Sequence, residues 1–571
     1  MAFQVSPGVE INEVDLTNVV PAVSTSIGAI AGAFAWGPVD RVVQVGSENQ
    51  LVDRFFEPND TTYKYFLPAA QFLQYANDLR VVRAEQDGML NSTSGAAGVL
   101  VKNEEHYETV TFDADQQFVS KYPGELGDSI GVYVVTNETA YNDSAFSSYA
   151  DLFDFAPGTS DYADARGVED DELHIVVVDE GGRITGTRNT VLEVWEGLSQ
   201  ARDAKSNNGQ TNYYVEVINQ QSRYVYVGVA DSQLTDSGKR TTDSSLPAGS
   251  DAAAQYTTVD DVLGYDLQNG SDGTDAEPSV GDLQFAYDLF ADAETIDVNL
   301  LIGAPVAETD DDTLAEYLIS IAEDRKDIVV FVSPAVSRTV NQVDAASNVK
   351  EWADSIGSSS YAVFDSGALY VFDKYNDTFR WINAAGDIAG LCAFTDNVQD
   401  PWFSPAGFNR GQIRGVTKLA FNPIKAERDT LYKARVNPIV SFPGEGIVLF
   451  GDKTAQAKPS AFDRINVRRL FIVLEKAIAT AAKFQLFELN DEFTRAQFRN
   501  LVEPFLRDVE GRRGMTDFQV VCDETNNTPQ VIDTNRFVAD IYIQPARSIN
   551  FISLNFIAVR TGVEFSEIAG Q

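Results

Sequence analysis

Histidine is the side chain most often used as an acid or base near neutral pH, and this chain has only two, His106 and His174. A Ser-His-Asp site would need one of them, and both lie in an acidic, loop-rich region. We also expect no Gly-x-Ser-x-Gly nucleophile elbow in this chain. The two cysteines, Cys392 and Cys522, lie far in sequence from each other and from the histidines, so no cluster has the spacing of a zinc site. We predict that both cysteines are reduced and buried, and that the chain has no catalytic residue, no metal and no cofactor.

Carboxylates are the abundant reactive groups, with 85 Asp and Glu against 43 Lys and Arg and a net charge of −42. The acidic runs at 169–172 and 310–312 lack the alternating oxygen ligands and central glycine of a calcium loop, so we interpret them as solvated loops. Carboxylate pairs arise by chance at this density, which leaves a glycan hydrolase acting through residues 96–280 as an alternative. The acidity argues against DNA or RNA as the main partner, because phosphates are bound by clustered cations.

The early apolar segment 27–36 is far shorter than the roughly 20 residues of a membrane-spanning helix. No charged segment followed by an apolar run opens the chain, as it would in a secretory signal. We therefore expect a protein made and assembled in the cytoplasm, without direct membrane insertion.

Alternating strand and helix patterns over residues 23–95 and 281–420 predict one layered α/β core domain. Gly28, Gly32 and Gly37 do not have the spacing of a dinucleotide-binding loop, so we interpret them as packing and turn glycines. The expected strands are 25–34, 42–45, 79–83, 296–302, 328–332, 361–364 and 369–372, and the expected helices are 47–55, 65–76, 313–325 and 348–355.

Residues 96–280 interrupt this pattern and are the most acidic part of the chain. Loop-rich polar runs separate short apolar segments there, and we expect strands at 173–178 and 213–218. This part is predicted to form one or two inserted β-rich outer domains.

The end of the chain differs in charge, since residues 401–571 carry 22 basic and 19 acidic side chains. We predict a C-terminal domain at 421–571 with helices at 460–484 and 492–510, and strands at 518–523, 537–544 and 549–560. Basic residues lie on the polar side of the first helix: Arg464, Arg468, Arg469, Lys476 and Lys483. This side is either a solvated surface or a face docked on an acidic partner.

Residues 1–22 are predicted to form an extended arm, in which Val9 and Ile11 alternate with polar residues as in a strand with one buried face. A single terminal strand is marginally stable alone, so it needs the edge of a sheet in its own chain or in another.

Several short motifs recur in an order that resembles the contractile tail sheath proteins of long-tailed bacteriophages. The order of the motifs carries the resemblance, since each alone is common. They are Pro-Gly-Val-Glu-Ile-Asn-Glu at 7–13, Gly-Pro at 37–38, Tyr-Pro-Gly-Glu-Leu-Gly-Asp-Ser at 122–129, Asn-Gly-Ser-Asp-Gly at 269–273, Ala-Ala-Gly at 384–386, Pro-Trp-Phe-Ser-Pro-Ala-Gly at 401–407, Asn-Val-Arg-Arg-Leu at 466–470 and Phe-Glu-Leu-Asn-Asp at 487–491.

The resemblance implies an α+β and α/β multidomain subunit, with a layered α/β core, inserted β-rich outer domains and a C-terminal α+β domain completed by terminal strand exchange. It implies a homo-oligomer of hexameric rings stacked helically around a tail tube, with the C-terminal domain inside and the inserted domains outside. Baseplate and tail terminator proteins would be the other partners. The matching intersubunit strand residues are Val5, Val9, Ile11 and Val14 in the first arm and Ile549, Phe551, Leu554 and Phe556 in the last.

By this resemblance the protein is a virion component whose sheath contracts and drives the tube through the host envelope, with no cofactor. The basic helix is then the candidate for holding the tube or a neighbouring subunit, and charge reversal at Arg468 and Arg469 is expected to weaken assembly. An acidic surface-layer or adhesin-type protein is the alternative, although the missing signal segment argues against it.

Overall fold

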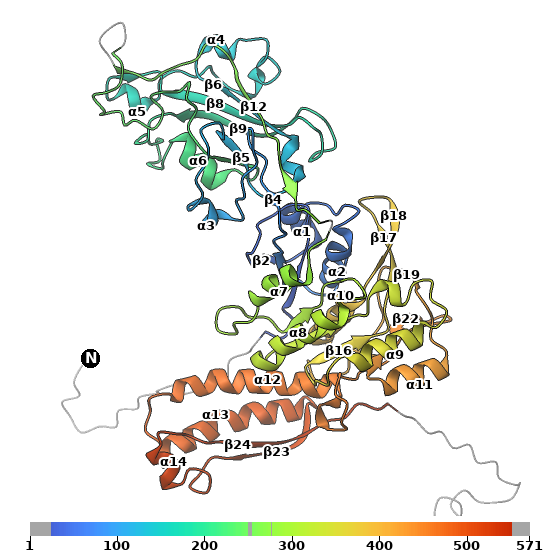
Figure 1. Ribbon diagram of the computed structural model, residues 1–571. Helices are drawn as coiled ribbons and strands as arrows, with labels where there is room; N and C mark the ends of the chain where they lie inside the picture. Colours follow the sequence, from blue (N-terminus) through green and yellow to red (C-terminus); the bar gives the residue numbers. More distant parts are fainter. Residues whose placement is uncertain (1–23, 249–253, 276, 551–571) are drawn as a thin grey trace, which may run out of the picture. The chain divides into compact units, whose positions relative to one another are not determined.

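The computed structural model describes residues 24–248, 254–275 and 277–550 (Figure 1). Its contacts divide the chain into two compact units. The core unit comprises Ser24–Gln399 and Pro405–Asp463. The C-terminal unit contains Asp400–Ser404 and the chain from Arg464 onward. The predicted domain boundary at 421 is therefore displaced, because residues 421–463 belong with the core unit.

A seven-stranded sheet organises the core unit, in the order β2-β3-β1-β14-β15-β16-β20. All neighbours are parallel except β2, which runs antiparallel to β3. The bounds are β1 Gly28–Gly32, β2 Val43–Val45, β3 Leu79–Arg83, β14 Leu300–Ile302, β15 Val329–Val332, β16 Ala362–Asp365 and β20 Val436–Asn437. The strand β20 explains the displaced boundary, since it closes this sheet beside β16.

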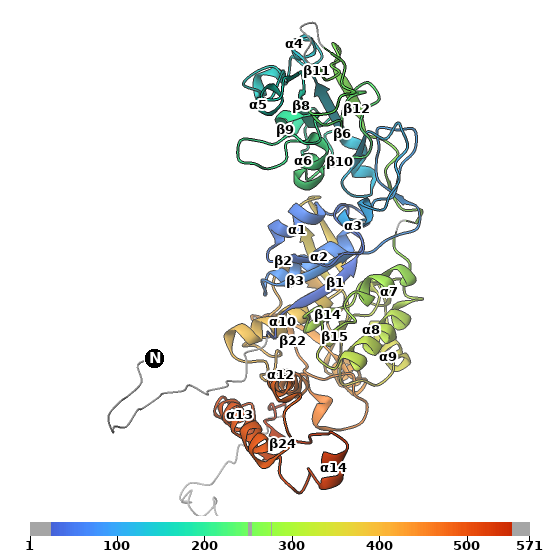
Figure 2. The same cartoon turned by 90° about the vertical axis from the view of Figure 1, so that its left-hand side faces the viewer.

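Helices cover both faces of the sheet. In Figure 2, α7 and α8 lie on one side of the central strands and α10 on the other, where α10 packs on α2. The helices are α1 Glu48–Phe55, α2 Tyr63–Leu73, α7 Val280–Asp288, α8 Asp311–Arg325, α9 Ala345–Ser355, α10 Ala385–Val398 and α11 Lys425–Lys433. The core unit thus combines a mostly parallel sheet with helices on both of its faces.

Strand β1 shows why its sequence consists of small residues. A Cβ added at Gly28 would lie 2.5 Å from the ring of Phe72, and one added at Gly32 would lie 2.5 Å from that of Tyr65. Gly37 has φ +103, a left-handed conformation that glycine adopts readily. The interpretation of these glycines as packing and turn positions is confirmed.

The chain leaves this sheet after β3 and returns at α7. Between these two points, β4 Met89–Leu90 of the outgoing chain pairs antiparallel with β13 Ser271–Asp272 of the returning chain. Arg83, fully buried, donates hydrogen bonds there to the carbonyls of Gly37 (3.1 Å) and Pro123 (2.8 Å). Burial lowers the pKa of Arg83 to about 10, against the opposing effect of Asp272.

The intervening segment is built mainly of strands. Its largest sheet is antiparallel, in the order β12-β6-β8-β9. The elements are α3 Glu104–Tyr107, β5 Phe118–Ser120, β6 Ile130–Val135, α4 Glu138–Tyr141, α5 Asp161–Asp164, β7 Val168–Glu169, β8 Glu172–Asp179, β9 Thr190–Ser199, α6 Tyr214–Gln221, β10 Val225–Val227, β11 Ala254–Gln255 and β12 Leu263–Asp266. The strand predicted at 213–218 is wrong, because α6 occupies this position.

Two smaller antiparallel sheets complete the core unit. One has the order β18-β17-β19 and the other is the hairpin β21-β22. Their strands are β17 Leu369–Asp373, β18 Thr378–Ile382, β19 Val416–Leu419, β21 Ile439–Phe442 and β22 Gly446–Leu449.

The C-terminal unit pairs two long helices with a small sheet. Its elements are α12 Ile465–Ala482, α13 Glu492–Gly511, β23 Met515–Val521, α14 Pro529–Asp533 and β24 Asp540–Pro545. Its hydrophobic core joins both helices to β23 and includes Trp402, whose indole nitrogen donates to the carbonyl of Arg512 at 3.1 Å. Cys392 in the core unit and Cys522 in this unit are both buried thiols, as predicted.

Candidate functional site

The basic helix α12 does not present the cationic face that its sequence predicts. Arg468 and Arg469 are buried, with exposed fractions of 5% and 4%. Each of Arg464, Arg468, Arg469 and Lys476 already takes part in a hydrogen bond, ion pair or ring contact within the protein. Of the five predicted basic residues, Lys483 is the exposed one.

The physical reason for this correction is that the first turns of α12 are enclosed on every side. Residues 465–470 are all buried, which a helix with one face in water does not show. The segment Asp400–Ser404 contributes to this cover, since the side-chain amide of Asn466 donates to the carbonyl of Trp402 at 3.2 Å. A helical wheel drawn from α12 alone does not include this distant segment.

The sheet of the C-terminal unit is incomplete. Strands β23 and β24 pair antiparallel, and within the described residues neither has a strand partner on its outer edge. Ile549 and Asn550 are exposed and belong to no strand. The remainder of the strand predicted at 549–560, with Phe551, Leu554 and Phe556, lies outside the described residues.

The N-terminal arm also lies outside them, including Val5, Val9, Ile11 and Val14. The assignment of either arm to a neighbouring sheet therefore stays a prediction. Because the outer edges of β23 and β24 have no strand partner within residues 24–248, 254–275 and 277–550, they offer a template on which a further strand can add.

The sequence analysis missed an exposed apolar loop between α12 and α13. Its large apolar side chains are 64% to 105% exposed: Phe484, Leu486, Phe487, Leu489 and Phe493. We call residues 484–493 the apolar loop. The motif at 487–491 was used only for its resemblance, and a loop without helical or strand period gives no pattern that assigns its side chains to a surface.

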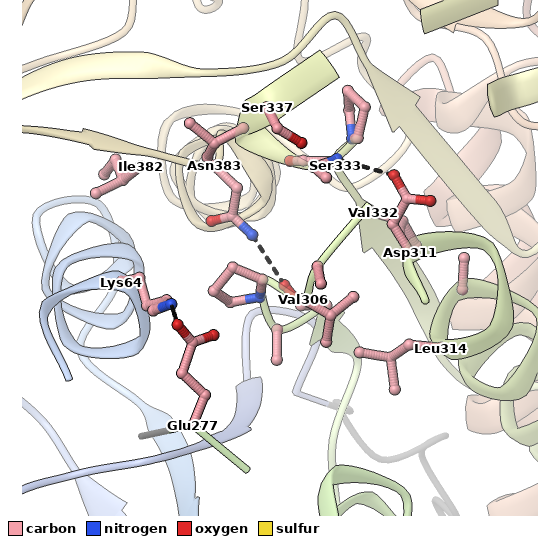
Figure 3. A pocket seen from close by; sticks show the side chains of 18 of the residues that line it. Lys64, Glu277, Val306, Asp311, Leu314, Val332, Ser333, Ser337, Ile382 and Asn383 are labelled. Carbon is pink, nitrogen blue, oxygen red and sulfur yellow. Dashed lines mark hydrogen bonds and ion pairs between the residues drawn. The ribbon is translucent and has the colours of Figure 1, made fainter. Parts of the chain in front are cut away.

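A cavity of about 270 Å³ opens at the carboxyl ends of β14 and β15 (Figure 3). Several of its polar groups take part in ion pairs or hydrogen bonds. Lys64 pairs with Glu277, and Asp311 accepts a hydrogen bond from Arg338 Nε at 2.6 Å. Asn383 donates to the carbonyl of Gly303 at 3.2 Å. None of the described residues that line the cavity is a histidine or cysteine. Each of the two lining carboxylates, Glu277 and Asp311, pairs with a cation. Such ion pairs stabilise the loops around the cavity and do not favour proton transfer.

The expectation that the chain has no Gly-x-Ser-x-Gly nucleophile elbow is wrong at the level of spacing, because residues Gly127–Gly131 have it. The structure places Ser129 at the end of a short helical turn that leads into β6, the reverse of the strand-to-helix order of an elbow. Its hydroxyl donates to Asp179 at 2.5 Å.

His174 on β8 has a structural role. Its Nδ1 accepts from the backbone of Gly197 at 3.0 Å, and its Nε2 lies 2.8 Å from the carbonyl of Phe155. The ring stacks on Phe153 with centroids 4.6 Å apart, and burial lowers the pKa of His174. With both nitrogens occupied, this histidine cannot act as a base for Ser129.

Two carboxyl groups are buried in the core unit, one at the end of β16 (Asp365) and one in the first turn of α10 (Asp387). Asp365 accepts hydrogen bonds from Ser333 Oγ (2.6 Å) and the backbone of Gly367 (2.8 Å), yet burial raises its pKa to about 7. Asp387 accepts from the hydroxyl of Tyr75 at 3.3 Å, and burial, reinforced by the charge of Asp365, raises its pKa to about 8.

We expect Asp387→Asn to change how stability depends on pH. The folded chain holds the Asp387 proton more tightly than the unfolded chain, whose aspartates titrate near a pKa of about 3.9. The wild type therefore loses stability as pH rises from about 4 through about 8, and the variant loses less, because only Asp365 of this pair still titrates there. Thermal unfolding should show similar melting temperatures at pH 4 and a more stable variant at pH 9.

The exposed residue Asp377 supplies the control for this experiment. The substitution Asp377→Asn should leave the difference from wild type small at every pH. A constant offset between Asp387→Asn and wild type across this pH range would contradict the expectation.

Across residues 24–248, 254–275 and 277–550, no helix is long and apolar enough to cross a membrane. The same part of the chain has no group of three or more His, Cys, Asp and Glu side chains placed to hold a metal ion.

Three family models match the sequence. They describe a phage tail sheath protein central domain over residues 282–455, a phage tail sheath C-terminal domain over 457–558, and the N-terminal region of domain III of the tail sheath protein Gp18 over 25–84. The tail sheath proteins of Vibrio phage KVP40 and Enterobacteria phage T4 are each 35% identical to this chain. Each alignment covers 99% of this chain and 99% of the relative.

Solved structures share the fold at lower identity. The sheath tail protein of Desulfitobacterium hafniense has a TM-score of 0.51 at 13% identity, over 90% of this chain and 94% of that one. The sheath tail protein of Listeria innocua has a TM-score of 0.51 at 11% identity, over 92% and 96%.

Proposed function

This chain belongs to the phage tail sheath protein family, and we propose that it polymerises as six-membered rings stacked helically around a tail tube. It is a structural component of the virion tail, a contractile sheath subunit. Contraction would then drive the tube through the host envelope, and the baseplate and tail terminator proteins would bound the sheath at its ends.

The open sheet of β23 and β24 is the observation that carries this proposal. Strands from neighbouring copies, residues 5–14 of one and 549–560 of another, would add to its two edges. Each backbone hydrogen bond gained in this way contributes about 0.5 to 1.5 kcal/mol net. Strand pairing between two subunits survives rotation of those subunits. A network of subunits joined by paired strands therefore stays connected while the subunits move.

The work of contraction would come from a choice between two packings of the same subunits. A sheath assembled in an extended, metastable arrangement releases free energy when its subunits rotate and bury new surface. This mechanism requires no cofactor and no catalytic group. Because Arg468 and Arg469 are buried, we assign them to the stability of the C-terminal unit rather than to contact with the tube.

Electron microscopy of the purified full chain tests the proposed function. We expect hollow cylinders from the wild type and dispersed, folded particles from a chain that lacks residues 1–22. Without these residues, no copy has an N-terminal arm that can pair with the sheet of a neighbour. Circular dichroism should show equal folding of both. As a control, replacing the exposed loop at 206–210 with glycine and serine should preserve the cylinders.

Cylinders of normal length from the truncated chain would contradict strand exchange by the first arm. Flat lattices from the wild type would instead favour the surface-layer alternative, and release of reducing sugar from polysaccharide by residues 96–280 would favour the hydrolase.

A further inference from the structure

The apolar loop joins α12 to α13 (Figure 1), and hydrogen bonds hold it at its base. Asn490 donates to the carbonyl of Arg536 at 2.8 Å and accepts from Arg495 at 2.9 Å. Asp491 accepts from the backbone of Thr494 at 2.8 Å and so caps α13. The loop is therefore ordered before it meets a partner, which reduces the entropy lost on binding.

Phe487 lies at the most exposed point of this loop. Its φ of 70° places a bulky residue in the left-handed region, where side chains other than glycine are disfavoured. Its ring is fully exposed. Backbone strain at an exposed aromatic residue is typical of a binding position, because burial against a partner can offset the strain.

The core unit has a second apolar surface, which we call the phenylalanine face. It consists of Phe408, Phe442 and Phe450, whose ring centroids lie 5.1 to 6.1 Å apart. The guanidinium of Arg428 lies 5.8 Å from the rings of Phe442 and Phe450. Phe408 and Phe450 are more than 40% exposed, and Ile424 beside Arg428 on α11 is 64% exposed.

The two surfaces differ in charge. Residues 483–493 carry one basic and three acidic side chains, namely Lys483 against Glu488, Asp491 and Glu492. Residues 405–463, which contain the phenylalanine face, carry nine basic and five acidic side chains. An acidic apolar loop and an aromatic surface that carries the Arg428 guanidinium are complementary in both respects.

We propose that the apolar loop of one copy docks on the phenylalanine face of a second copy. This rests on the proposed function, since it adds a contact to the polymer. A contact between two different patches is heterologous, and repeated contacts of this type generate rings or open helices rather than closed two-fold dimers. Aromatic anchors such as Phe487 and Phe450 supply most of the binding free energy at such interfaces.

Mixed cysteine variants test this contact between copies. Chains with Phe487→Cys are mixed with chains with Phe450→Cys and then oxidised. We expect disulfide-linked dimers from the mixture and none from either variant alone. The native cysteines are buried, and Val343→Cys at a fully exposed position elsewhere replaces Phe450→Cys in the control mixture. Dimers from Phe487→Cys alone would show loop-to-loop contact and overturn the proposal.

Assembly measurements give a second readout that does not depend on disulfide geometry. Phe487→Ser and Phe450→Ser should each raise the critical concentration for cylinder formation roughly tenfold or more, the effect of losing one anchoring side chain. The double variant should add little, because both changes remove the same contact. Phe487 is fully exposed, so the melting temperature of Phe487→Ser should not change. Phe450 also packs on Phe408 and Phe442, so Phe450→Ser is assayed at a temperature where circular dichroism shows it folded.

Cylinders from both single variants at the wild-type concentration would overturn the proposal and leave the proposed function intact. Normal cylinders that no longer retain a tube would assign the loop to the tube, which also overturns it. Absence of cylinders from the wild type would count against the proposed function itself.

Discussion

Replacing Gly386 by alanine is expected to destabilise the core unit by about 3 kcal/mol, the upper range for forcing a methyl group into a packed interior. Helix α10 crosses α2 at this residue, and a Cβ at Gly386 would lie 2.2 Å from the carbonyl oxygen of Pro68. The obstacle is backbone, so no side-chain rotation relieves it. The two helices would have to separate, which opens the packing on that face of the central sheet.

The expected loss of stability is opposite in sign to the usual effect of replacing glycine by alanine in a helix. In an exposed helix, glycine to alanine stabilises by roughly 0.5 to 1 kcal/mol. Gly281 in α7 offers the matched control, since the nearest atom to an added Cβ there is Ser279 Oγ at 3.6 Å. Urea unfolding should therefore show Gly386→Ala less stable and Gly281→Ala unchanged or more stable than wild type. Equal stability of the two variants would contradict the close packing of α10 on α2 at Gly386.

The sequence predicted the layers of the core unit well because their signals are local. Apolar runs such as 328–332 and 79–83 are bounded by turns and are long enough to be assigned without knowledge of their neighbours. The small residues of β1 predicted close packing, although not that Tyr65 and Phe72 of α2 fill the space.

The structural predictions were wrong where a segment distant in sequence determines the local structure. Residues 213–218 form a run of aromatic and β-branched residues typical of a strand, but Tyr214, Val217 and Ile218 also lie on one face of a helix, and the core of the insertion buries them in that form. The boundary at 421 failed because β20 is a two-residue strand whose role depends on pairing with β16.

The candidate site depended even more on tertiary context. Periodicity identified α12 and α13, yet it could not show that Trp402, more than sixty residues earlier than Asn466 and Leu470, packs in the same unit. Nor does composition distinguish the exposed phenylalanines of the apolar loop from those of a core. Exposure is a property of the folded chain, so both surfaces of the proposed contact required the structure.

Reversing the charge of Arg468 should therefore unfold the C-terminal unit rather than merely weaken assembly. Arg468 is buried and engaged within the protein, so Arg468→Glu removes a cation from a site that accommodates one and places an anion there. A buried charge left without a compensating partner costs about 3 to 5 kcal/mol. Limited proteolysis with mass spectrometry should show new cleavage sites within residues 464–550, at a temperature where the wild type resists.

Lys483→Glu supplies the control, because Lys483 caps the same helix and is exposed. An acidic residue at a helix C-terminus costs only about 0.3 to 1 kcal/mol, so this variant should resist proteolysis as the wild type does. If Arg468→Glu also kept wild-type resistance but formed shorter cylinders, the arginine would serve contact between subunits, and burial in the single chain would be a poor guide to its role. Loss of resistance in Arg468→Glu alone would instead place the cationic residues of α12 inside the subunit, leaving the apolar loop and the open sheet edges for assembly.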